Sequence, residues 1–127
     1  MEAMEQKICI DTDVVISLFK GRPEAKNWLS GINVSECFVS SITVFELQLR
    51  EKGIEVIDDF LNSITILPFD RIAAKKSAMI HKDLKRKGKL IDFRDIFIAS
   101  TAMVNGMQIM TFNKKRFLNI PELQLFK

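Results

Sequence analysis

The sequence predicts an α/β fold: a three-layer α/β/α sandwich with a central, mainly parallel sheet of four or five short strands. Short apolar runs recur along the chain and alternate with longer segments of helical character. Parallel strands need a long crossover connection, usually a helix, and this spacing supplies one between successive strands. Glycine, proline and capping residues mark most of the boundaries between the segments.

In the first half of the chain, strands and helices alternate. The predicted elements, in order, are a strand at 7–10, helices at 14–20 and 23–30, a strand at 37–39 and a helix at 42–52. Gly21 ends the first helix, and Pro23 suits the first turn of the second, where its missing N–H costs no hydrogen bond. Ser40 and Ser41 can cap the helix that follows the second strand, and Gly53 ends it.

The second half continues the alternation. The predicted elements are a helix at 54–61, a strand at 64–67, helices at 70–87 and 92–105, a strand at 108–111, a short helix at 114–118 and a strand at 123–126. Pro68 closes the third strand, and Asp70 caps a long basic helix that Gly88 ends. Asn105 and Gly106 form a strong signal for the end of the following helix.

Length and composition indicate one globular domain, residues 1–127. Hydrophobic residues make up 47% of the chain and charged residues 28%, which is typical of a folded protein. No apolar stretch approaches the roughly 20 residues that cross a bilayer. The segment 1–7 contains Glu2 and Glu5 and lacks an apolar segment followed by a cleavage site, so it does not resemble a signal peptide. We therefore expect a cytoplasmic protein with no membrane segment.

The cysteine and histidine content argues against several classes of site. Cys9 and Cys37 each lie inside an apolar run, and we expect both to be small buried thiols. The chain has no CxxC pair, and His81 is its single histidine, which argues against a zinc site and against Ser/His/Asp or Cys/His hydrolases. We therefore expect the chemistry to rely on carboxylates.

Charge is distributed unevenly along the chain. Residues 1–70 contain 6 Lys/Arg and 12 Asp/Glu, whereas residues 71–127 contain 13 and 4, so the halves carry −6 and +9. The second half therefore suits contact with phosphate, and the first supplies most of the carboxylates. A solvated basic helix face is the alternative interpretation.

Segments with polar side chains lie at, or directly after, the carboxyl ends of three predicted strands. They are Asp11, the pair at 40–41, and the segment 111–113. In parallel α/β sheets, functional groups gather beyond the carboxyl ends of the strands, so this pattern predicts a site there. Capping of the next helix is an alternative role for Asp11.

Glu46 occupies an apolar helix face, with Ile42 and Leu49 as its helical neighbours. An unpaired buried charge costs several kcal/mol, so this carboxylate needs a metal or a basic partner. A structural salt bridge is the alternative.

Asp95 shares its helix face with apolar and small residues at 91, 98, 99 and 102. Asp92 lies three positions earlier, on the same side of the first turn. Capping accounts well for Asp92 and less well for Asp95.

Three carboxylates from separate elements, without a nearby histidine, favour Mg²⁺ or Mn²⁺, since hard cations take oxygen ligands. We expect Asp11, Glu46 and Asp95 to hold the ion. Phosphodiester hydrolysis suits such a cluster, because the metal lowers the pKa of a bound water and neutralises charge on phosphate. The basic half would then hold the nucleic-acid backbone, with Lys85, Arg86, Lys87 and Lys89 as the candidates.

These residues occur in three stretches: IDTDVVISLFKG, SSITVFELQ and DFRDIFIASTAMVNGMQIMTFNKKRF. In order and spacing they resemble PIN-domain nucleases, and more narrowly the VapC-type toxins of prokaryotic toxin–antitoxin pairs. The resemblance covers nearly the whole chain. It places Asp11, Glu46 and Asp95 at the family's metal-binding carboxylates, with Thr12 beside the first.

The resemblance implies an α/β/α nuclease that uses Mg²⁺ or Mn²⁺ to cut RNA. It further implies a homodimer and an antitoxin whose tail blocks the active site. Many relatives carry a fourth acidic residue where this chain has Asn113 or Arg116, which leaves the number of metal ions open. Asp92 can compensate if it faces the cleft, and Asn113 can orient a water. The role of Asp13, where relatives often show Asn or Ser, is not assigned.

Two other functions remain open from the sequence. A non-catalytic PIN-like module that binds RNA or protein would explain the missing acid. A phosphatase with Asp11 as nucleophile would explain the DTD sequence, although Val14 and Val15 replace the Gly-Thr expected after it. The aromatic residues Phe45, Phe60, Phe93 and Phe97 are expected in the core.

Overall fold

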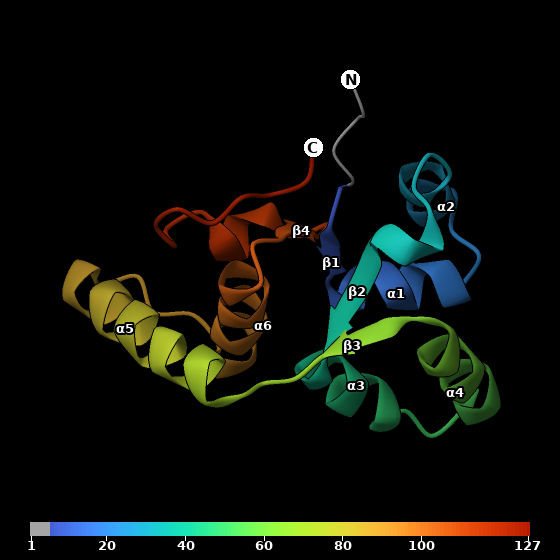
Figure 1. The fold of residues 1–127 in the computed structure, drawn as a ribbon, viewed down its shortest axis with the longest axis horizontal. Helices are drawn as coiled ribbons and strands as arrows, with labels where there is room; N and C mark the ends of the chain where they lie inside the picture. The colour runs from blue at the N-terminus through green and yellow to red at the C-terminus, as the bar shows by residue number, and fades with distance from the viewer. Residues whose placement is uncertain (1–5) are drawn as a thin grey trace.

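A four-stranded parallel sheet lies at the centre of the computed structural model, which describes residues 6–127 (Figure 1). The strands are β1 (Ile8–Ile10), β2 (Cys37–Ser40), β3 (Thr65–Leu67) and β4 (Gln108–Met110). Their order is β3-β2-β1-β4, and every neighbouring pair is parallel. The predicted parallel α/β sheet is thus confirmed. Of the segment 1–7, predicted not to be a signal peptide, residues 1–5 lie outside the described residues.

Helices connect the strands as the sequence predicts. They are α1 (Thr12–Phe19), α2 (Pro23–Leu29), α3 (Ser41–Gln48), α4 (Ile54–Ser63), α5 (Arg71–Lys87) and α6 (Phe93–Val104), with 3₁₀ turns η1 (Val34–Glu36) and η2 (Lys114–Phe117). The helix ends follow local chemistry. Ser40 Oγ accepts the Thr43 N–H at the start of α3, and Asp70 Oδ1 accepts the Ala73 N–H at the start of α5.

Helices form the two outer layers, and apolar side chains fill the space between each helical layer and the sheet. One cluster joins α5, α6 and η2 to the sheet through residues such as Ile80, Ile98 and Phe117. The other cluster packs the four helices α1, α2, α3 and α4 against the opposite face, through residues such as Val14 and Leu47. Figure 1 shows α5 and α6 on one side of the strands, and α1, α2 and α4 on the other. The three-layer sandwich is confirmed.

Both cysteines are free and buried, as predicted. Burial, and then the charge of Asp11, raises the pKa of the Cys9 thiol to about 12. A thiol in this state is a small hydrophobic core residue and not a nucleophile.

Two predicted elements differ from the structure. The predicted strand at 123–126 is a single bridge, Ile109 to Leu125, because its backbone hydrogen bonds to β4 are confined to Ile109, which donates to Gln124 O and accepts from the Phe126 N–H. Helix α3 ends at Gln48 and not near residue 52, because Leu49 is 59% exposed and a further turn would bury little apolar surface.

The prediction that all four phenylalanines lie in the core was wrong for two of them. Phe45 is 54% exposed and Phe93 is 60% exposed. Each lies on the outer side of its helix, a position that neighbouring residues in the sequence do not reveal. Among residues 6–127, no helix has both the length and the apolar character needed to span a bilayer.

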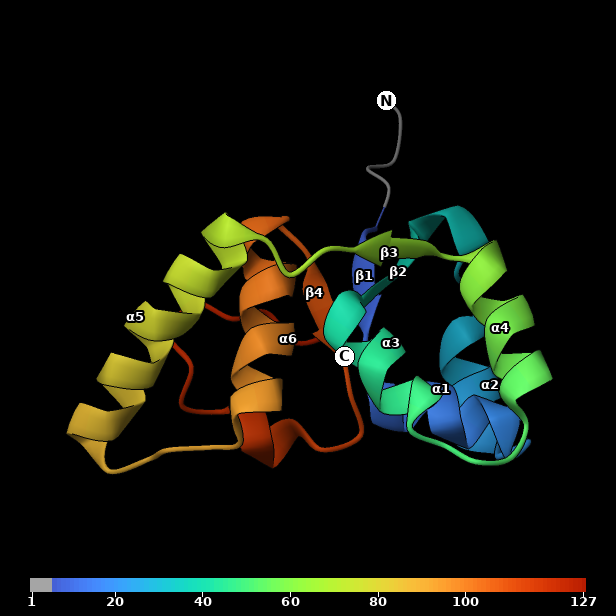
Figure 2. The ribbon, with the colours of Figure 1, turned by 90° about the horizontal axis from the view of Figure 1, so that it is seen from below.

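The carboxyl ends of the strands lie along one edge of the molecule. Figure 2 shows the first turns of α1 and α6, together with η2, along this edge, and the α5–α6 connection reaches α6 there. The fold therefore brings residues from the start, middle and end of the chain to one place.

Candidate active site at the carboxyl ends of the strands

Asp11 lies at the centre of this edge, between β1 and α1. Its side chain is 2% exposed. Oδ1 accepts a hydrogen bond from the Thr12 N–H at 2.8 Å, and Oδ2 accepts one from the Thr111 hydroxyl at 2.8 Å. Asp11 therefore caps α1, the alternative role raised above, and also directs its second oxygen toward the end of β4.

Arg116 connects Asp11 to Asp95. Its Nη1 donates to Asp95 Oδ1 at 2.9 Å, and its Nη2 donates to Asp11 Oδ2 at 3.2 Å. Asp95 itself lies in the first turn of α6 and is buried. Two of the three predicted carboxylates, those of Asp11 and Asp95, thus bond the same guanidinium, although they are 84 positions apart in the chain.

Asp13 belongs to the same cluster and accepts a hydrogen bond from the backbone of the loop after β4. Its Oδ2 accepts the Phe112 N–H at 3.2 Å and lies 3.6 Å from Arg116 Nη2. Its Oδ1 is buried without a hydrogen-bond partner among the described residues. The negative charge left unassigned from the sequence is therefore a further carboxylate of this site.

Glu46 is linked to the cluster through Thr12 and not by direct contact. Its Oε1 accepts the Thr12 hydroxyl at 2.9 Å, and its Oε2 lies 3.7 Å from Arg94 Nη1. The Thr12 hydroxyl also lies 3.0 Å from that of Thr43 in α3. Glu46 therefore has the basic neighbour that its apolar helix face requires, and Thr12 joins α1 to α3.

The other candidates lie at the rim. Asp92 caps α6, where its Oδ1 accepts the Arg94 N–H at 2.8 Å, and its side chain is 51% exposed. The side-chain hydrogen bond from Arg94 lowers the pKa of Asp92. Asn113 is exposed, and its N–H donates to the Thr111 hydroxyl at 3.1 Å.

Burial dominates the electrostatics of the cluster. It raises the pKa of Asp11 to about 7, with a further increase from the charge of Asp13, while the hydrogen bond from Thr111 and the charge of Arg116 act in the opposite direction. Burial also raises the pKa values of Asp13 and Asp95, against the lowering effect of Arg116. These are carboxylates that a cation would stabilise.

The donor set suits a hard divalent cation, because it consists of carboxylate oxygens that already surround a positive group. As the side chains stand, no three His, Cys, Asp or Glu residues within 6–127 lie close enough together to hold a metal ion. The guanidinium of Arg116 lies between two of the predicted ligands and bonds both Asp11 and Asp95. The fold therefore brings the predicted ligands to one edge of the sheet, but their side chains are not arranged as a metal-coordination site.

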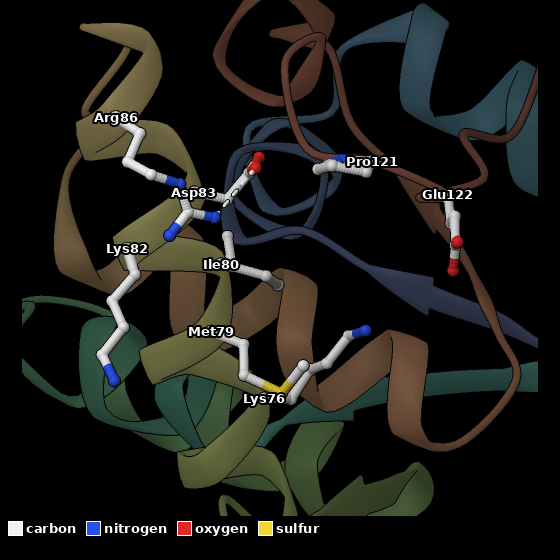
Figure 3. Close-up of a pocket in the computed structure, with 8 residues that line it drawn as sticks. All are labelled: Lys76, Met79, Ile80, Lys82, Asp83, Arg86, Pro121 and Glu122. Atoms are coloured by element: carbon white, nitrogen blue, oxygen red, sulfur yellow. Dashed lines mark ion pairs between the residues drawn. The ribbon is translucent and has the colours of Figure 1, made fainter.

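Of the basic residues predicted to contact RNA at the end of α5, Arg86 lines a hollow (Figure 3). Arg86 and Lys87 pair with Asp83, at 3.6 Å and 2.7 Å, while Lys85 and Lys89 are exposed. The hollow has a volume of about 340 Å³ and lies between α5 and the chain at 121–122. Its lining is rich in cationic side chains and includes none of the site carboxylates: Lys76, Met79, Ile80, Lys82, Asp83, Arg86, Pro121 and Glu122.

Sequence reasoning did not assign roles to three residues that hold the site together. In the sequence, Arg116 stands out only as a departure from the family pattern, and no pattern indicates Arg94. Thr111, which is fully buried and bonds Asp11, could be suspected only from its position after a strand. Each acts through a contact with a residue distant in the chain, which leaves little local signal.

Comparison with known proteins supports the family. A sequence model described as the PIN domain matches residues 8–123. Ribonuclease VapC2 of Haemophilus influenzae is 34% identical over 125 residues, covering 93% of this chain and 95% of the relative. The tRNA(fMet)-specific endonuclease VapC of Shigella flexneri is 29% identical over 125 residues, with coverage of 93% and 95%.

A solved structure agrees with the sequence comparisons. The crystal structure of DNA-bound VapBC from Salmonella typhimurium contains a chain that superposes with a TM-score of 0.85 at 26% identity, covering 95% of this chain and 97% of that one. This chain therefore belongs to the PIN domain family, and within it to the VapC ribonucleases.

Proposed function

We propose that this chain is a metal-dependent endoribonuclease and the toxin of a toxin–antitoxin pair. The observation that carries the proposal is that Asp11 and Asp95 both contact the guanidinium of Arg116. They do so at the edge of the sheet where α/β proteins bind their ligands. The ribonuclease names of the relatives support the choice of RNA as substrate. A phosphatase that uses Asp11 as nucleophile receives no such support.

Asp11, Asp95 and Glu46 are the residues that would hold Mg²⁺ or Mn²⁺. Bound there, the ion supplies an activated water and neutralises charge on the phosphate. Hydrolysis of RNA adds one water across a P–O bond, so that the water oxygen joins the phosphorus and the leaving oxygen takes a proton to become a hydroxyl.

The chain's own residues orient the carboxylates for this task. The Thr111 hydroxyl and the Thr12 N–H fix the two oxygens of Asp11. The Thr12 hydroxyl fixes one oxygen of Glu46, so a single residue aligns carboxylates from two elements. Such positioning lowers the cost of reorganising the site during the reaction.

The basic surface at the end of α5 is the proposed contact for the RNA backbone. Lys85 and Lys89 are exposed there and, within residues 6–127, form no ion pair. Contacts of this kind provide affinity without a choice of sequence. The choice of RNA therefore depends on other features.

An antitoxin protein is the proposed partner, since the structural relative is a VapBC assembly. A homodimer and a cytoplasmic location remain predictions that the resemblance and the sequence make.

The test is cleavage of a structured RNA, such as a tRNA, in Mg²⁺. We expect Asp11→Asn to reduce the rate at least about 100-fold, because it removes a metal-binding charge. Asp59→Asn is the matched control, since Asp59 is exposed on α4, away from the site. Equal rates for wild type and Asp11→Asn would refute the proposal.

A non-catalytic RNA-binding module is the second candidate, and the bridging Arg116 favours it. Such a module would bind the tRNA in a filter-binding assay but would leave it uncut by wild type in both Mg²⁺ and Mn²⁺.

A further inference from the structure

We propose that Arg116 is an internal counter-ion that competes with the divalent cation for Asp11 and Asp95, and so sets the metal affinity of the site. This inference rests on the proposed function. It assigns a role to Arg116, a basic residue at one of the two positions where the family resemblance leads one to expect an acidic residue.

The geometry is that of a bridge. A guanidinium presents several N–H donors in a planar fork, and here its two terminal nitrogens serve different carboxylates, at 2.9 Å to Asp95 and 3.2 Å to Asp11. The second of these nitrogens also lies 3.6 Å from Asp13. Since both oxygens that Arg116 contacts most closely belong to predicted metal ligands, the guanidinium occupies lone pairs that a metal would use, and its positive charge opposes a second cation there.

The bridge is also displaceable. The Arg116 Nε is buried and has no hydrogen-bond partner among residues 6–127, which is unfavourable for a charged donor. The side chain is 35% exposed, so it has a path to solvent. A guanidinium that leaves the cluster recovers the hydration that its Nε lacks.

Charge counting supports competition. The contacts of Arg116 and Arg94 connect five carboxylates, those of Asp11, Asp13, Glu46, Asp92 and Asp95. Five negative and two positive charges leave −3 when all are ionised. Without Arg116 the balance is −4, so a divalent cation meets a stronger attraction and no internal rival.

Loss of Arg116 therefore has opposite effects with and without metal. Without metal, the buried carboxylates lose their partner, which destabilises the fold. With metal, the ion takes the place that Arg116 held and restores stability. If Arg116 instead only held the carboxylates in position for the metal, its removal would weaken metal binding.

The experiment is calorimetric titration of the full chain with Mn²⁺, comparing wild type with Arg116→Gln. We expect Arg116→Gln to bind Mn²⁺ on the order of tenfold more tightly, because a competitor worth a charged hydrogen bond has gone. Lys115→Gln is the matched control: it removes the same charge from the adjacent exposed residue, and its affinity should stay within about twofold of wild type.

Thermal melting provides the second readout. In EDTA we expect Arg116→Gln to melt at a lower temperature than Lys115→Gln, and saturating Mn²⁺ should raise its melting temperature more than that of wild type. Equal or weaker Mn²⁺ binding by Arg116→Gln would overturn the inference.

Should Arg116→Gln fail to fold, Arg116→Lys keeps the charge but cannot bridge both carboxylates, and should also bind Mn²⁺ more tightly than wild type. NMR of the ¹⁵N-labelled arginine side chains tests the wild type directly. The Arg116 Nε–H signal should move when Mg²⁺ saturates the protein, and an unmoved signal would contradict competition.

The two proposals fail in different ways. If tRNA is cut equally by wild type and Asp11→Asn, the proposed function fails. If cleavage depends on Asp11 while Arg116→Gln binds Mn²⁺ no more tightly than wild type, only the role of Arg116 fails.

Discussion

Asp11 joins structure and chemistry in one side chain. It caps α1, accepts the hydroxyl of Thr111 and pairs with Arg116, all while 2% exposed. A helix cap alone needs no such burial. The sequence identifies Asp11 from its position after a strand, but its partners lie 100 and 105 positions away.

The raised pKa of Asp11 predicts a pH-dependent stability for the metal-free protein. Between its unfolded value of 3.8 and its folded value of about 7, the folded state holds more protons than the unfolded state. Stability contributed by this group is therefore present below about pH 4 and is lost as the pH rises through 7. We expect the melting temperature in EDTA to fall between pH 5 and pH 8, and to fall less in Asp11→Asn.

Differential scanning calorimetry of the two proteins across this range measures the effect. Identical pH profiles would show that Asp11 does not titrate in this window. Excess Mg²⁺ should remove the decline, because a bound cation favours the ionised carboxylate.

At the scale of elements, helix boundaries position the charges. Helix α6 begins at Phe93, so Asp95 lies in its first turn and faces the cluster. Helix α5 ends at Lys87, and the chain then turns toward the start of α6. Gly88, which follows the last residue of α5, has a φ of +66°. This left-handed conformation is costly for residues with a Cβ.

Gly88→Ala is therefore expected to lower the free energy of unfolding by about 1 kcal/mol. Gly31→Ala is the control, because Gly31 has an ordinary φ and, like Gly88, leaves space for a Cβ. Urea denaturation measures both. The explanation would be wrong if the two variants lost the same stability.

At the scale of the whole molecule, charge separates into an acidic half and a basic half, and the fold combines them. The carboxylates at the strand ends come mostly from the first half, while Arg94, Arg116 and the basic end of α5 come from the second. A substrate phosphate at the carboxylates would thus be close to positive charge contributed by the rest of the chain.

This arrangement predicts the salt dependence of RNA binding. The double variant Lys85→Gln and Lys89→Gln should bind RNA more weakly, and the slope of log affinity against log salt should fall by about 1.5, or roughly 0.7 to 0.9 for each phosphate that is no longer neutralised. Lys20→Gln with Lys52→Gln removes the same charge from exposed positions in the acidic half and should leave the slope unchanged. Fluorescence anisotropy in EDTA, which prevents metal-dependent cleavage, measures both, and equal slopes would exclude α5 as the RNA-binding surface.

Much of the fold could be predicted from the sequence, because strands and helices depend on local patterns. The apolar run at 8–10 and the Gly88 stop each appear where predicted. The segment 123–126 was predicted as a strand from its composition, whereas it pairs with β4 only at Ile109. Exposure was harder: Phe45 and Phe93 follow an apolar pattern yet lie on outer helix faces.

By itself the sequence determined the parallel α/β architecture and the candidate carboxylates Asp11, Glu46 and Asp95, because periodicity, capping and charges on apolar faces are local properties. Only the tertiary structure decided how those charges are balanced. It placed Arg116 on Asp11 and Asp95, put Asp13 beside them and linked Glu46 through Thr12. Such pairings depend on side chains that meet across 21 to 105 positions, and the energy of a buried charge depends on those contacts and not on sequence neighbours.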